Sequence, residues 1–263
     1  MRIALVDSGI GMLSTAAALR AARPDADLFL SMDPDHMPWG PRAPEQVIER
    51  ALAGADAAAR AATEDGGPLD AVVVPCNTAS VHGLDALRAR YEPAVPVIGT
   101  VPAIKPAAAA GTPIAVWSTE ATTRSAYQRG LVETFAKDVA VTPVACVGLA
   151  EAVESADPER IAETVGYAAA LTPARVRGVV LGCTHYDLVG QQISEALGGR
   201  TELFTAADAV AAQALRRIGA AERPVERVGR VRVLASGRPA TLPPAALTYP
   251  AGRFLWNEAP AEP

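Results

Sequence analysis

The segment VVLGCTHYDL, Val179–Leu188, is an aliphatic run that ends abruptly in Gly182, Cys183, Thr184 and His185. A short apolar run closed by glycine and polar residues predicts a buried β-strand. A thiol, a hydroxyl and an imidazole therefore follow directly on the end of that strand. In parallel α/β sheets, ligands bind at the carboxyl ends of the strands, so the segment predicts both a fold class and a site.

A second thiol occurs in the same setting 107 positions earlier, in the segment DAVVVPCNTAS, Asp70–Ser80. Each segment contains a Val-rich strand, one Pro or Gly, and then a cysteine followed by two hydrogen-bonding residues. Most free cysteines are small core residues, but reactive thiols need polar, accessible sites. Polar residues directly follow both Cys76 and Cys183 in the sequence. Cys146 lies in PVACVGL without a polar neighbour and is expected to be a core residue.

The rest of the chain alternates aliphatic runs with helical segments, from Arg2–Asp7 onward. This alternation predicts an α/β fold with parallel strands, because a helix usually forms the crossover between them. The repeated thiol segment predicts two similar three-layer lobes with mainly parallel sheets, facing each other across a cleft. The segment Val139–Ser155 is expected to be a strand followed by a polar connection, and the Pro- and Ala-rich tail from Tyr249 to be loosely ordered.

Composition excludes several classes of function. The 263 residues are half apolar, which is enough for a substantial core. The net charge is −5 and the cations are scattered, which argues against a nucleic-acid surface. No apolar run approaches the roughly 20 residues of a membrane span, so a cytoplasmic protein is expected. Three cysteines do not form a disulfide framework.

Other chemistries fit the residues less well. A zinc site needs three or four ligands, and Cys-Thr-His alone supplies two, so no metal is expected. Pyridoxal phosphate needs a Schiff-base lysine, but the chain has only Lys105 and Lys137, neither at a strand-end motif. The opening loop lacks the third glycine of a dinucleotide site, since Ser14 stands there, and Asp7 would repel a pyrophosphate. These observations favour a mechanism without a cofactor.

Six motifs in order resemble the aspartate/glutamate racemase superfamily, and within it the glutamate racemases most closely. They span nearly the whole chain. The motifs are VDSGIGML (Val6–Leu13), MPWGPR (Met37–Arg42), PCNTAS (Pro75–Ser80), GTVPAIKPA (Gly99–Ala107), STEATTRS (Ser118–Ser125) and LGCTHYDL (Leu181–Leu188).

The resemblance implies a first lobe of residues 1–99 plus 207–263 and a second lobe of residues 100–206, with an amino-acid substrate held between them. It implies racemisation of glutamate by two thiols, without cofactor or metal, and D-glutamate supply for peptidoglycan. It leaves a homodimer open as the assembly. The implied catalytic residues are Cys76 and Cys183, supported by Asp7, Glu151 and His185. The implied substrate-binding residues are Ser8, Trp39, Gly40, Asn77, Thr78, Thr119, Thr122 and Thr184.

Three departures from the family pattern bear on the substrate. Met12 replaces a glycine, Trp39 replaces a tyrosine, and Tyr186-Asp187 stands where an aromatic residue followed by proline is common. Trp39 loses a phenolic hydroxyl and gains bulk, which predicts a changed pocket. Three alternatives therefore stay open: a racemase acting on aspartate or a hydantoin, a decarboxylase or isomerase of the same superfamily, and a non-catalytic ligand-binding relative.

Overall fold

The computed structural model describes residues 1–219 and 228–257, which form two compact units. Unit 1 consists of Met1–Thr100 and Ala207–Pro263, and unit 2 of Val101–Ala206. Each unit is a mainly parallel sheet with helices packed on it, so the predicted α/β class is confirmed. No helix among the described residues is both long and apolar enough to cross a bilayer.

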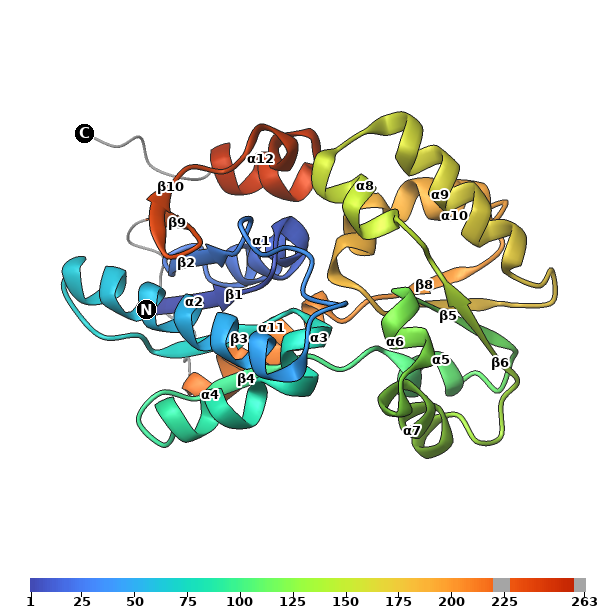
Figure 1. Ribbon diagram of the computed structural model, residues 1–263, viewed down its shortest axis with the longest axis horizontal. Coiled ribbons are helices and arrows are strands. Elements are labelled where there is room, and N and C mark those ends of the chain that lie inside the picture. Colours follow the sequence, from blue (N-terminus) through green and yellow to red (C-terminus); the bar gives the residue numbers. More distant parts are fainter. Residues whose placement is uncertain (220–227, 258–263) are drawn as a thin grey trace. The chain divides into compact units, whose positions relative to one another are not determined.

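The sheet of unit 1 has the strand order β10-β9-β2-β1-β3-β4, and only the β9–β10 pair is antiparallel (Figure 1). Its central strands are apolar on both faces, as strands covered by helices on both sides must be. Ala4 and Leu5 of β1, for example, point to opposite faces of the sheet and are both fully buried. The strands are β1 (Arg2–Val6), β2 (Asp27–Met32), β3 (Ala71–Val74), β4 (Val97–Gly99), β9 (Val231–Ala235) and β10 (Arg238–Ala240).

Helices cover both faces of this sheet. A row of small residues on α2 (Pro44–Glu64), including Ala51 and Ala55, packs with Val6 and Val72 of the strands in one core cluster. The helix α1 (Leu13–Ala22) packs against two C-terminal helices, α11 (Ala207–Ile218) and α12 (Pro250–Asn257). The other helices of the unit are η1 (Ile10–Met12), α3 (Asn77–His82), α4 (Leu84–Tyr91) and η3 (Pro244–Thr248).

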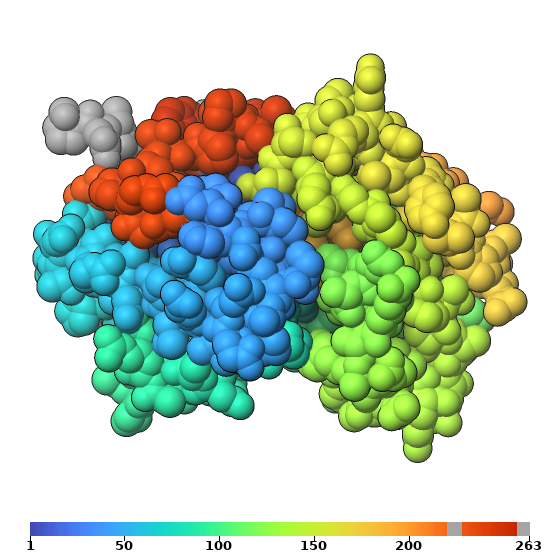
Figure 2. Space-filling view, in the orientation of Figure 1, coloured from blue at the N-terminus to red at the C-terminus, as the bar shows by residue number. Residues whose placement is uncertain are grey.

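The C-terminal segment is an integral part of unit 1. Strand β9 pairs in parallel with β2, and in the space-filling view the orange-red C-terminal residues lie directly against blue residues of the N-terminal part (Figure 2). The expectation of a loosely ordered tail from Tyr249 is wrong for Pro250–Asn257, which form α12. Leu255 is fully buried, and a Cβ on Gly252 would lie 2.0 Å from the Ala246 carbonyl oxygen. Residues 258–263 lie outside the described part of the chain.

Unit 2 has an all-parallel sheet of order β6-β5-β7-β8. Its strands are β5 (Ile114–Ser118), β6 (Val141–Ala145), β7 (Gly178–Leu181) and β8 (Glu202–Phe204). Its helices are α5 (Ile104–Ala108), α6 (Glu120–Arg124), α7 (Ala126–Phe135), α8 (Leu149–Ser155), α9 (Pro158–Leu171), η2 (Thr184–Val189) and α10 (Gly190–Ala196).

Helix α8 corrects a second expectation. The sequence pattern predicts a polar connection at the end of Val139–Ser155, but Leu149–Ser155 form a helix that packs against α9 and η2. Gly148 precedes it with a φ of 75°, a left-handed conformation that glycine adopts without steric cost. The helix buries Leu149, Ala152 and Val153, so its acidic residues lie on the remaining faces.

Candidate active site

In unit 1, the predicted site residues lie at one edge of the sheet. Asp7 and Ser8 follow β1, and Cys76 follows β3, the neighbouring parallel strand. Asn77 and Thr78 form the first turn of α3, and Trp39 and Gly40 lie in the loop between β2 and α2. The carboxyl ends of parallel strands meet at the same edge, so the fold brings these positions together, as ligand sites in such sheets require.

Asp7 is a buried carboxylate, with 1% of its surface exposed. Its Oδ1 accepts a hydrogen bond from the Ser8 backbone N–H at 2.6 Å and another from the Ser8 hydroxyl at 3.3 Å. Its own backbone N–H donates to the Ser31 carbonyl at 3.2 Å, which extends the β1–β2 pairing to the site. The orientation of the Asp7 carboxylate is therefore fixed by its own neighbour.

Cys76 is buried in the core cluster of unit 1, with 6% of its surface exposed. Its carbonyl accepts from the Ser80 backbone N–H at 2.9 Å. The Ser80 hydroxyl donates to the Val74 carbonyl at 3.0 Å and accepts from the Thr100 backbone N–H at 2.9 Å. These bonds join β3, α3 and the segment after β4, and so fix the turn that carries the thiol.

In unit 2, Cys183 follows β7 and is partly exposed. The His185 side chain is almost fully buried, at 3% exposure, and lies between two groups. Its Nδ1 lies 3.9 Å from the Cys183 sulfur, and its Nε2 lies 2.7 Å from Oε2 of Glu154. The unit thus contains a thiol–imidazole–carboxylate row, the arrangement in which a carboxylate orients an imidazole toward its partner.

The environment of His185 favours its protonated form. Burial lowers the pKa of His185, but the hydrogen bonds to Cys183 and Glu154 and the charges of these two groups together raise it by more, so the net pKa lies well above 6.5. A protonated imidazole donates hydrogen bonds from both ring nitrogens. His185 can therefore donate to the Glu154 carboxylate and point a second N–H at the thiol.

Glu154 is the site residue that the sequence reasoning missed. Glu151, the predicted supporting carboxylate, is exposed one turn earlier on α8, and its charge contributes to a raised pKa of the buried Tyr186 hydroxyl, for which burial is the main cause. The i, i+3 spacing of the two glutamates on a helix was the available signal. The sequence pattern predicts a connection and no helix at Leu149–Ser155, so this spacing does not single out Glu154. The role of Glu151 stays a prediction.

The two predicted threonines near β5 cap a helix. Thr119 is the N-cap of α6, and its Oγ1 accepts from the Thr122 backbone N–H at 3.4 Å and donates to the Thr122 hydroxyl at 3.0 Å. This pairing accounts for the spacing of the two residues without a ligand. Their predicted contact with substrate stays a prediction.

The third thiol differs from the other two. Cys146 is 2% exposed, and burial together with the nearby charge of Cys183 raises the pKa of the Cys146 thiol far above the usual range. A thiol that stays protonated in an apolar setting is inert. Among residues 1–219 and 228–257, no group of three or more His, Cys, Asp and Glu side chains has the geometry to hold a metal ion.

Gly182, which precedes the thiol of unit 2, lies against β5. Its N–H donates to the Trp117 carbonyl at 2.7 Å, and a Cβ at this position would lie 2.9 Å from the same oxygen and 3.2 Å from Cβ of Ser118. The obstacle is backbone, which cannot move without shifting the strand. Glycine is therefore required for Cys183 to emerge at this place.

We expect Gly182→Ala to lower the free energy of unfolding by about 2 kcal/mol, the usual cost of overpacking. Urea denaturation followed by circular dichroism measures it. The control is Gly130→Ala in α7, where a Cβ meets nothing within 4 Å and alanine should stabilise the helix by about 0.5–1 kcal/mol. Equal stability of Gly182→Ala and the parent chain would contradict the steric argument.

Comparisons with known proteins by sequence and by structure find racemases of one family. Residues 9–214 match the family model described as Asp/Glu/hydantoin racemase. The chain is 36% identical over 219 residues to a glutamate racemase of Pseudomonas syringae pv. tomato, covering 81% of this chain and 77% of that protein. It is 35% identical to a glutamate racemase of Herpetosiphon aurantiacus, covering 90% and 93%. The crystal structure of Escherichia coli glutamate racemase with L-glutamate and the activator UDP-MurNAc-Ala superposes with a TM-score of 0.77, at 26% identity, covering 97% of this chain and 92% of that one.

Proposed function

Because the chain belongs to the Asp/Glu/hydantoin racemase family, we propose that it interconverts L- and D-glutamate by moving the Cα proton, without a cofactor. The observation that carries the proposal is the pair of strand-end thiols, Cys76 in unit 1 and Cys183 in unit 2, each with polar followers. Curated relatives at 35–36% identity over most of the chain are glutamate racemases, which supports glutamate as the substrate.

Inversion at Cα requires two acid/base groups. One removes the proton from one face of the carbon, and the other delivers a proton to the opposite face. An ordinary thiol titrates near pH 8.5, so both its protonated and deprotonated forms are accessible near neutral pH, as acid/base catalysis requires. In the proposed cycle, one cysteine starts as thiolate and the other as thiol, and their states are exchanged after each turnover.

Neighbouring groups support each thiol in this proposal. Asp7 assists near Cys76, where its buried carboxylate can accept a proton or orient the substrate ammonium. His185 assists Cys183 from 3.9 Å, and Glu154 holds the imidazole in place. The predicted support from Glu151 is kept as a proposal to be tested against Glu154.

Neutral donors hold the substrate carboxylates in this proposal, since the motifs contain no arginine clamp. Hydroxyl, amide and backbone N–H groups at strand ends serve this purpose in parallel α/β sheets. The residues assigned to this role are Ser8, Asn77, Thr78 and Thr184, while Trp39, Gly40, Thr119 and Thr122 stay predicted substrate positions. The D-glutamate formed supplies peptidoglycan synthesis. A cytoplasmic location and a homodimer stay predictions.

Incubation of the protein with L-glutamate in deuterated water tests the proposal. We expect the Cα proton signal to disappear in proton NMR while chiral chromatography detects D-glutamate, because every inversion takes up a solvent deuteron. L-Aspartate and allantoin, run in parallel, should exchange at least about 10-fold more slowly, since each misfit substrate loses one or two well-placed contacts.

Three outcomes would contradict parts of the proposal. Faster exchange of aspartate or allantoin would reassign the substrate within the family. Loss of a carboxyl group from any substrate would indicate a decarboxylase. Tight binding of glutamate without exchange at Cα would identify a ligand-binding relative.

A further inference from the structure

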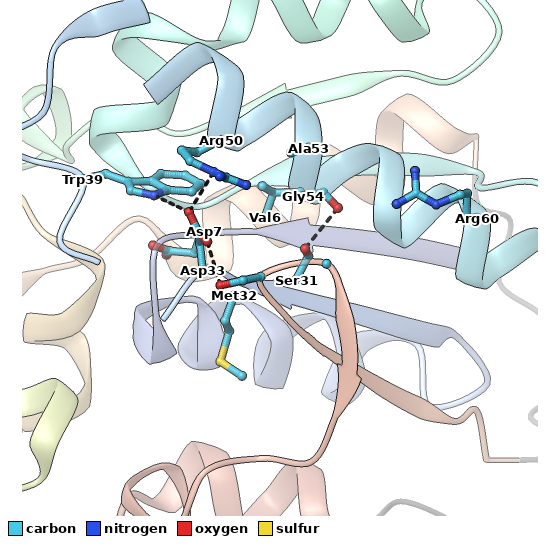
Figure 3. Close-up of a pocket in the computed structure, with 12 residues that line it drawn as sticks. Val6, Asp7, Ser31, Met32, Asp33, Trp39, Arg50, Ala53, Gly54 and Arg60 are labelled. Carbon is cyan, nitrogen blue, oxygen red and sulfur yellow. Dashed lines mark hydrogen bonds and ion pairs between the residues drawn. The ribbon is translucent and has the colours of Figure 1, made fainter. Parts of the chain in front are cut away.

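A buried carboxylate beside the substrate loop of unit 1 has no role in the proposed mechanism. Asp33 follows β2, is 5% exposed, and both of its carboxylate oxygens are engaged. Oδ1 accepts from the Ser236 hydroxyl at 2.8 Å and lies 3.0 Å from Nδ1 of His36. Oδ2 accepts from the Trp39 indole N–H at 3.1 Å and lies 3.3 Å from Nε of Arg50. Figure 3 shows Trp39 and Arg50 both directed at this carboxylate.

The partners of Asp33 come from three separate parts of the fold. His36 and Trp39 belong to the β2–α2 loop, Arg50 to α2, and Ser236 to the turn between β9 and β10. Ser236 has a φ of 47°, a left-handed conformation that costs a non-glycine residue energy. Gly237, the other residue of this two-residue hairpin turn, also has a positive φ, of 81°, as a type I′ turn requires, and the turn presents the Ser236 hydroxyl to Asp33.

Asp33 contacts two of the proposed substrate-binding residues, Ser8 and Trp39. The Asp33 backbone N–H donates to the Ser8 carbonyl at 3.2 Å, and the Asp33 side chain holds the Trp39 indole. Trp39 is 1% exposed, so the bulk gained by replacing tyrosine is accommodated inside unit 1. The indole therefore anchors the loop, and the neighbouring Gly40 backbone takes its position from that anchor.

Core packing and one hydrogen bond together hold this anchor in place, since Trp39 also belongs to the core cluster of unit 1. A cavity of about 240 Å³ lies beside it, lined by Asp7, Asp33, Trp39 and Arg50 among others (Figure 3). On that side the indole borders polar groups of the cavity and not apolar core side chains. The hydrogen bond from the indole N–H to Asp33 therefore fixes the orientation of the ring where it borders the cavity.

We propose that Asp33 is a positioning residue that sets the Trp39–Gly40 loop and Ser8 for substrate binding. The proposal rests on the proposed racemase function and adds a residue to its specificity machinery. Because the loop binds substrate and does not transfer the proton, loss of the anchor should act on KM more than on kcat.

Kinetics of four variants test this. Asp33→Ala should raise KM for glutamate about tenfold and change kcat less than about threefold. Asp33→Asn should be milder, because its amide oxygen can still accept from Trp39. Trp39→Phe keeps an aromatic ring but removes the indole N–H. If Asp33 acts through that N–H, the double variant Asp33→Ala/Trp39→Phe should have a KM close to that of Asp33→Ala alone. A KM raised by the product of the two single effects would overturn the inference.

A matched control is Asp65→Asn. Asp65 is also a partly buried carboxylate of unit 1 paired with an arginine, Arg232, at 2.9 Å, but it lies at the end of α2 away from the loop. This variant makes the same change of charge as Asp33→Asn and should leave KM unchanged. An equal rise of KM in the two Asn variants would show that Asp33 acts only by general destabilisation of unit 1.

Hydrogen exchange gives a readout that does not depend on activity. In Asp33→Ala, the backbone amides of residues 33–42 should exchange at least about tenfold faster, because exchange reports local opening. The Arg42 amide, bonded to the Trp39 carbonyl at 3.1 Å, is one of the reporters. Unchanged exchange in this segment would overturn the inference about Asp33. Absence of racemisation by the parent protein would instead overturn the proposed function.

Discussion

Serine in place of either Cys76 or Cys183 is expected to lower kcat for racemisation about 10³-fold in both directions, within the range that general acid/base groups contribute. Serine has nearly the same shape as cysteine, but its hydroxyl is a far weaker acid and neither removes nor returns the Cα proton. Polarimetry from each pure enantiomer of glutamate measures the effect. Racemisation at the parent rate by either variant would contradict the two-thiol mechanism.

Exchange in deuterated water gives a sharper result with the same variants. A variant that keeps one thiol can still remove the proton from one enantiomer and return a deuteron to the same face. Cys76→Ser and Cys183→Ser should therefore label opposite enantiomers without inverting them. The control is Cys146→Ala, which removes the buried third thiol and should keep kcat within about threefold of the parent value. Labelling of the same enantiomer by both thiol variants would show that the cysteines do not act on opposite faces.

Glu154→Gln is expected to lower kcat about 10²-fold and the free energy of unfolding at neutral pH by about 2 kcal/mol. The substitution keeps a hydrogen-bonding side chain but removes the negative charge 2.7 Å from the His185 Nε2. Without it, burial dominates and the pKa of His185 falls. The imidazole then loses its fixed orientation toward Cys183, and the thiol loses its partner.

The pH dependence of stability follows from the sign of this shift. The pKa of His185 is raised in the folded protein, so its protonation contributes stability that is fully present below about pH 6.5, the ordinary histidine value. That contribution is lost as the pH rises above 6.5 through the folded-state pKa. Urea denaturation at several pH values from 5.5 to above 8 should show this decline in the parent protein and a flatter profile in Glu154→Gln.

Glu151→Gln is the matched control, since it makes the same change of charge on an exposed position of α8. It should leave stability within about 0.5 kcal/mol of the parent value. If Glu151→Gln reduced kcat strongly and Glu154→Gln did not, the supporting carboxylate would be Glu151, as the sequence resemblance implies. Equal losses of kcat in Glu151→Gln and Glu154→Gln would indicate that the total charge of α8 matters and not one particular carboxylate.

The sequence predicts those parts of the site that follow a strand directly. Asp7, Cys76 and Cys183 each close an aliphatic run, and the position of a residue at a strand end is a local property. The parallel arrangement also follows from alternation of strands and helices. The local sequence pattern is therefore sufficient to predict that Cys76 and Cys183 lie at strand ends.

Residues that depend on distant contacts were not predictable in this way. Glu154 lies on the short helix α8, and its proposed role depends on its contact with His185, 31 positions away. Helix α12 has few strong helix formers and is held by burial of Leu255. Asp33 depends on Ser236, 203 positions away. Propensity and periodicity carry no information about such pairs.

The return of the chain to unit 1 sets an order of events during synthesis. All of unit 2 is translated before β9, so it can fold while the β2 edge is still bare. At about 5–20 residues per second, the roughly 200 residues between β2 and β9 take on the order of 10–40 s. Throughout that interval Asp33 lacks Ser236. The Trp39–Gly40 loop therefore acquires this restraint only after all of unit 2 has been translated, and a nascent chain stopped before residue 231 would carry both thiols while Asp33 still lacks one of its partners.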